Sequence, residues 1–140
     1  MRRITPWLVF LAAATIVPAS AAALASPTVR LAIVHAVQGC HVWGTADSRP
    51  LGAAHTIAVR RGTRLEIRVN CPMDFHFSEV SGPPLALGDP LTHAGTVRAI
   101  VFDVRGVYRL RAVNVQSSAD QGLQTLGADN VLTLIVRVSS

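Results

Sequence analysis

Alternation of apolar and polar residues is the feature that most limits what this chain can fold into. Within the segment 64–69, Leu65, Ile67 and Val69 are separated by charged side chains. The segments 108–112 and 132–138 alternate in the same way. Successive side chains of a strand point to opposite faces, so a period of two predicts strands with one buried face. No segment has a sustained helical period, and we therefore predict an all-β protein.

Shorter apolar runs and frequent turn residues extend this prediction over the rest of the chain. The runs cover 29–34, 57–59 and 97–102, and glycine- or proline-containing turns separate them. Short strands with turns between them predict a single Greek-key β-sandwich or barrel. The longest irregular segment, 81–95, is expected to cross one edge or end of it.

The first 25 residues have the layout of a secretory signal peptide. Arg2 and Arg3 precede an apolar run from Trp7 to Val17, and small residues follow up to Ala25. That order of basic, apolar and small-residue regions is typical of a cleaved export signal, and the run is shorter than the roughly 20 residues that cross a bilayer. We predict a signal peptide over 1–25, one domain over 26–140, and an extracytoplasmic location, secreted or periplasmic.

Charge and composition exclude several functions. The formal net charge is +5, of which Arg2 and Arg3 contribute two, and the remaining arginines are spread along the chain. An exported protein in which aromatic residues make up only 5% is not expected to bind nucleic acid. The mature chain is not expected to span a membrane. It contains no nucleophile elbow, zinc-protease helix motif or phosphate-binding glycine loop, so we predict no enzyme activity.

Two cysteines, each followed by a histidine, are the candidates for chemistry. They occur as Cys40-His41 and as Cys71 followed by Met73 and His76. Thiolate, thioether and imidazole are donors that suit copper. We therefore predict a metal site of Cys40, His41, Met73 and His76, with copper as the cofactor.

The same residues support a second interpretation without metal. Outside the cytosol Cys40 and Cys71 can form a disulfide, which would close a loop of about 30 residues and stabilise the fold by about 3–4 kcal/mol. A lone loop methionine such as Met73 is more often apolar cover. Both interpretations remain open at this point.

Other residues near these motifs are expected to be structural. Trp43 is expected to plug one end of the barrel, although it could also shield a metal site. His35, His55 and His93 are isolated in the sequence and are expected to be surface or strand-end histidines.

Two stretches of the chain resemble cupredoxins, the family of blue copper proteins. Arg61-Gly62-Thr63, a strand Leu65 to Val69, then Asn70 and a loop to His76 is similar to the third strand and following loop of that family. Phe102 to Leu110, with Gly106-x-Tyr108 inside it, looks like the entry to the family's penultimate strand. The resemblance implies a cupredoxin-like β-sandwich in which His76 is the first histidine ligand and Val131 to Val138 is the closing strand.

The resemblance also shows what the chain lacks. The family's copper-binding cysteine falls at Ala112, and residues 113–130 include no cysteine, histidine or methionine. A thiolate gives the blue copper site its character. We therefore expect no conventional blue electron-transfer site.

Cupredoxin topology further implies where the candidate ligands meet. The first strand, Val29 to His35, and the third, Arg64 to Asn70, would run parallel and adjacent. Cys40-His41 and the segment from Cys71 to His76 would then converge at one end of the barrel.

The sequence thus predicts an exported cupredoxin-like protein that binds copper, or a similar soft metal, at a non-standard site for carriage or sequestration. The alternative is a metal-free, disulfide-stapled β-sandwich that acts as an extracytoplasmic binding or structural module. It would use its arginine-bearing face or the Ser81–Gly95 loop. The sequence identifies no protein partner.

Overall fold

The computed structural model describes residues 25–36, 41–115 and 131–140, which form ten strands. The strands are β1 (Thr28–His35), β2 (His41–Thr45), β3 (Pro50–Gly52), β4 (Ala54–Arg60), β5 (Thr63–Asn70), β6 (Asp74–Ser81), β7 (Leu91–Thr92), β8 (Val97–Phe102), β9 (Gly106–Val115) and β10 (Val131–Ser139). Within these residues no helix is long and apolar enough to cross a membrane. All but the last residue of the predicted signal peptide lies outside the described part.

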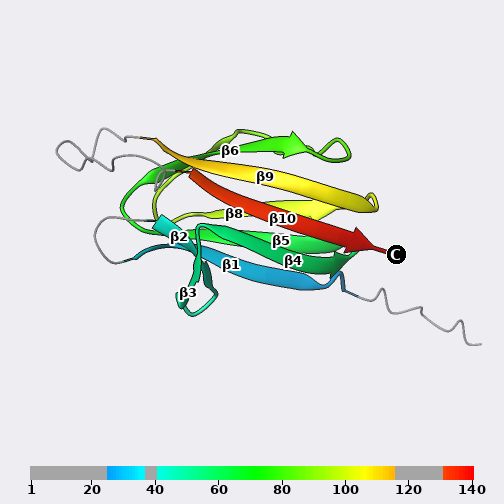
Figure 1. The fold of residues 1–140 in the computed structure, drawn as a ribbon, viewed down its shortest axis with the longest axis horizontal. Coiled ribbons are helices and arrows are strands. Elements are labelled where there is room, and N and C mark those ends of the chain that lie inside the picture. The colour runs from blue at the N-terminus through cyan, green and yellow to red at the C-terminus, as the bar shows by residue number, and fades with distance from the viewer. Residues whose placement is uncertain (1–24, 37–40, 116–130) are drawn as a thin grey trace, which may run out of the picture.

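The strands form two five-stranded sheets packed face to face (Figure 1). Sheet A has the order β3-β2-β1-β5-β8, and sheet B has the order β4-β10-β9-β6-β7. The chain passes repeatedly from one sheet to the other, as it does in Greek-key sandwiches. The predicted all-β sandwich is confirmed.

The parallel pairing of β1 with β5 confirms the topology that the resemblance implied. The two strands pair from Thr28 opposite Arg64 to Val34 opposite Asn70. With this pairing in place, the fold is a cupredoxin-like β-sandwich. The strands β1, β5 and β9 finish, and β2, β6 and β10 begin, at the same end of the sandwich, on the left of Figure 1. We call it the His41 end.

The alternation that predicted β5 is present in the structure. Leu65, Ile67 and Val69 are fully buried between the sheets, whereas Arg64 and Arg68 are exposed on the outer face. On that face Glu66 accepts hydrogen bonds from Arg30 and Arg64, both at 3.1 Å. Exposed ion pairs of this kind contribute little to stability, so burial of the apolar face holds the strand.

Trp43 joins the two sheets through the middle of the core. It lies in β2, has no exposed surface, and its indole Nε1 donates a hydrogen bond to the carbonyl oxygen of Thr133 in β10 at 2.9 Å. Trp43 lies two residues into β2, close to the His41 end, which agrees with its expected place at one end of the barrel. It packs inside because β2, a strand that the sequence did not predict, places it on the inner face of sheet A.

The glycine-x-tyrosine entry to β9 has a steric cause. Gly106 has a φ of 152°, and a Cβ there would lie 2.7 Å from Cγ of Pro83. Two residues later Tyr108 is buried, and its hydroxyl donates to the carbonyl oxygen of Val104 at 2.7 Å. The predicted penultimate strand is confirmed, and the start of the 81–95 segment packs directly against it.

Arg98 anchors the rest of the 81–95 segment. Its guanidinium is buried 5.1 Å above the ring of Phe77 and donates to the carbonyl oxygens of Leu87 and Leu91 at 2.6 and 3.0 Å. It also donates to the carbonyl oxygen of Asp89. The segment predicted to be irregular therefore has a fixed path and includes the short strand β7.

Candidate metal centre

His41 is a polar residue buried at this end of the sandwich. As the first residue of β2 it shares the inward face of that strand with Trp43, and it is only 1% exposed. Its ring meets the rings of His35 and Phe75 edge to face, with centroids 5.2 and 5.3 Å away. The imidazole therefore lies between the end of sheet A and the start of β6 in sheet B.

Both ring nitrogens of His41 lack a hydrogen-bond partner within the described residues. A neutral imidazole has one N–H donor and one acceptor nitrogen, and leaving a buried polar group unsatisfied costs about 1–3 kcal/mol. Burial first, and the neighbouring His35 second, lower the pKa of His41 below its usual 6.5. The ring is therefore neutral at neutral pH, which is the form that coordinates a metal ion.

Two sulfur-bearing side chains come from the loop between β5 and β6 at the same end. Cys71 is 9% exposed, and its Sγ lies 3.8 Å from the carbonyl oxygen of Met73. Met73 is 2% exposed, and its Sδ accepts a hydrogen bond from Nδ2 of Asn114 at 3.0 Å. Both side chains belong to the hydrophobic core.

His76 lies on the opposite face of sheet B. It is exposed, and its neighbours Phe75 and Phe77 are buried in the core, as the strand phase predicted. Because Phe75 contacts His41 on the inner face, alternation directs the His76 side chain outward. The structure does not bring His76 to His41.

The remaining candidate, Cys40, lies outside the described residues. Its role as a copper ligand and its disulfide with Cys71 both stay predictions. Among the described residues no three histidine, cysteine or acidic side chains surround one point.

His35 is the neighbour that the sequence did not assign to the site. It was expected to be a surface or strand-end histidine, and it is the exposed last residue of β1. It also lies directly opposite His41 in the pairing of β1 with β2. A signal for this was present in the sequence: His35 is in phase with Leu31 and Ile33, so it shares their inward face.

Asp74 and His93 are in contact at the start of β6. Asp74 is 9% exposed, and its carboxylate accepts from the backbone N–H of Ala94 at 2.8 Å and contacts Nδ1 of His93 at 2.9 Å. Burial alone raises the pKa of Asp74, but the bonds from Ala94 and His93 outweigh it and hold the pKa below 3.8.

This depressed pKa predicts an acid-dependent loss of stability. Asp74 stabilises the folded protein at pH values above the pKa that it has in the unfolded chain, about 3.9. This stabilisation is lost as the pH falls through the lower pKa of the folded protein. Urea unfolding between neutral pH and about pH 3 measures this effect. The free energy of unfolding of the wild type should exceed that of Asp74→Asn most at neutral pH, and the two values should converge in acid. A difference that stays constant over this range would contradict the assignment.

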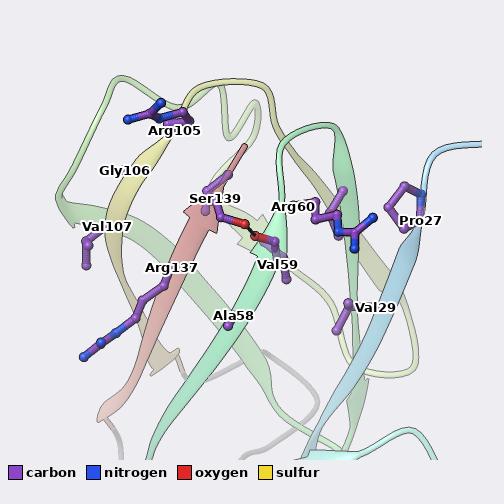
Figure 2. A pocket seen from close by; sticks show the side chains of 12 residues that line it. Pro27, Val29, Ala58, Val59, Arg60, Arg105, Gly106, Val107, Arg137 and Ser139 are labelled. Atoms are coloured by element: carbon purple, nitrogen blue, oxygen red, sulfur yellow. Dashed lines mark hydrogen bonds between the residues drawn. The ribbon is translucent and has the colours of Figure 1, made fainter.

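A groove lies at the opposite end of the sandwich (Figure 2). The groove has a volume of about 800 Å³, and three of its lining residues are arginines, Arg60, Arg105 and Arg137. Of the described residues that line it, none is a histidine, cysteine, methionine or acid. This groove therefore has no part in the candidate metal centre.

The chain matches no protein-family profile and no curated protein sequence. Among solved structures it overlaps a purple cupredoxin from Nitrosopumilus maritimus, with 18% identity, a TM-score of 0.44, and coverage of 79% of this chain and 99% of that one. It also overlaps the cysteine protease inhibitor EhICP2 from Entamoeba histolytica, with 9% identity, a TM-score of 0.39, and coverage of 84% and 100%.

A further overlap is with the McoA multicopper oxidase from Aquifex aeolicus. The identity is 10%, the TM-score is 0.35, and the overlap covers 89% of this chain but 32% of the oxidase. All three TM-scores are low, and the fold assignment rests on the strand order and pairing described above.

Proposed function

We propose that this protein is exported and binds copper at the His41 end of its sandwich, for carriage or sequestration. The observation that carries the proposal is His41, a nearly inaccessible imidazole with both ring nitrogens unsatisfied within the described residues. A metal–nitrogen bond would remove part of the cost of that burial. No residue that lines the groove at the other end offers a comparable donor.

The donors predicted for this end suit a soft ion. His41 supplies an imidazole, and the thiolate of Cys40 and the thioether of Met73 are the sulfur candidates, whereas His76 faces outward from sheet B. Such ligands favour cuprous copper over zinc. Ala112, fully buried in β9, stands where the resemblance requires a cysteine, which favours holding the ion over blue electron transfer.

A titration with cuprous ion against a competing chromophoric chelator tests the proposal. Wild type is expected to bind one equivalent, and to bind it more tightly than zinc. Losing an outer-shell partner of a metal ligand costs about 10–100-fold in affinity, so His41→Ala, which removes a ligand, should lose at least that much. His93→Ala is the matched control, because the His93 side chain is 65% exposed and pairs with Asp74.

Equal and weak copper uptake by wild type and His41→Ala would refute the metal site. The metal-free alternative would then be the better account. It predicts that the exported protein has no free thiols and loses stability when Cys40 or Cys71 is replaced. The arginine-bearing groove of Figure 2 would be the surface to examine for that binding module.

A further inference from the structure

His35 and His41 occupy one cross-strand position at the edge of the core. His35 is the last residue of β1, His41 is the first of β2, and the two are directly opposite in register. Opposite residues of an antiparallel pair have Cβ atoms about 4.5–5.5 Å apart on the same face of the sheet. Here that face is the inner one, because His35 is in phase with Ile33 and His41 with Trp43, both of which have no exposed surface.

The separation of the two rings matches a shared ion. Imidazole nitrogens coordinate at about 2.0–2.1 Å, so two imidazoles on one tetrahedral ion have ring centroids roughly 5 Å apart. The centroids of His35 and His41 are 5.2 Å apart, and the ring planes are inclined by 79°. The backbone pairing already holds the two rings at the spacing that chelation needs.

The two rings differ in exposure. His41 is 1% exposed and is backed by the ring of Phe75, whereas His35 is exposed. In the proposed pair, His35 is therefore the ligand nearer to solvent, and Phe75 is the apolar side chain that packs against His41. An apolar wall behind a metal limits solvent access to it.

Packing alone does not account for the pair. Edge-to-face aromatic contacts also have centroids within about 4.5–7 Å, so the distance is shared by both explanations. The ring nitrogens distinguish the two explanations, because an edge contact leaves both nitrogens of the buried His41 ring without a hydrogen-bond partner within the described residues. That state costs free energy which a phenylalanine at the same place would not incur.

We propose that His35 and His41 form a cross-strand imidazole chelate for the copper ion, with His35 as the second histidine ligand. The inference rests on the proposed function and specifies its ligand pair. His35 takes the part that the sequence assigned to His76, whose side chain faces outward from sheet B. The chelate lies in the β1–β2 hairpin and leaves the position of Ala112 without a role in binding.

Cuprous ion is diamagnetic, so nuclear magnetic resonance of isotope-labelled histidines reads the ligands directly. On addition of one equivalent, the ring nitrogen signals of His35 and His41 are expected to shift, and those of His76 and His55 to stay in place. Affinity for cuprous ion should fall at least tenfold in His35→Ala and in His35→Gln. Loss of an outer-shell partner alone costs about 10–100-fold, and these variants remove a ligand. It should change by less than about twofold in His76→Ala and His55→Ala, the matched single-histidine controls, as is usual for surface substitutions.

The outcomes separate the ligand pair from the function itself. Tight binding that is lost in His41→Ala but retained in both His35 variants would overturn the chelate and leave the proposed function standing. Loss in His76→Ala, with a shifted His76 signal, would also overturn it. Absence of tight binding in wild type would overturn both. Thermal unfolding of each copper-free variant shows that folding is intact, as expected for His35 because it is exposed.

Discussion

Replacing Trp43 with alanine is expected to lower the free energy of unfolding by about 3–5 kcal/mol. The side chain has no exposed surface, so the substitution leaves a large cavity in the core. It also removes the hydrogen bond from the indole to the carbonyl oxygen of Thr133, which joins β2 to β10. The cavity and the lost hydrogen bond both lower the free energy of unfolding.

Urea unfolding followed by far-ultraviolet circular dichroism measures this loss. Fluorescence does not serve, because the other tryptophan of the chain is Trp7, within the predicted signal peptide. Trp43→Phe keeps one aromatic ring in the core but loses the hydrogen bond and part of the buried surface, so it should lose about 1–3 kcal/mol, less than Trp43→Ala. Val107→Ala is the surface control, at a side chain that is 58% exposed, and should stay within about 0.5 kcal/mol of wild type. A loss below about 1 kcal/mol in Trp43→Ala would contradict its place in the core.

The fold was predictable where a strand shows its pattern within a short segment of the sequence. In β5 the alternation of Leu65, Ile67 and Val69 with charged residues is a property of eight consecutive residues, and the structure keeps it throughout the strand. The strand β2 has five residues and includes Gly44, so its pattern is too short to identify. Its glycine has a tertiary cause: a Cβ there would lie 3.0 Å from Cγ1 of Val34 in the neighbouring strand.

The candidate site was predictable only in part, for a related reason. Strand phase correctly separates His76 from Phe75 and Phe77, but which of the two faces is inward depends on the partner sheet. The resemblance pointed to His76. The pairing of His35 with His41 follows from the β1–β2 register, and the lack of partners at His41 depends on everything that surrounds it. Neither is a property of a short segment of sequence.

Replacing His41 with phenylalanine is expected to stabilise the copper-free protein by about 1–3 kcal/mol, the cost of an unsatisfied buried polar group. A phenyl ring can keep the contacts with His35 and Phe75, whose centroids lie 5.2 and 5.3 Å from that of His41, and it has no polar atom to satisfy. Under the proposed function the same substitution abolishes tight copper binding. The native residue would then be one that lowers stability and is retained for binding.

Urea unfolding of wild type and His41→Phe, with and without cuprous ion, tests both effects together. A ligand that binds only the native state adds about 2.7 kcal/mol at a free concentration of 100 times its Kd, so copper should stabilise wild type and leave His41→Phe unchanged. His41→Ala is the matched control, because it removes the ring nitrogens and also leaves a cavity, and it should be less stable than His41→Phe. A copper-free His41→Phe protein that is less stable than wild type would show that the imidazole nitrogens are satisfied in solution, and the case for a metal at this position would lose its main support.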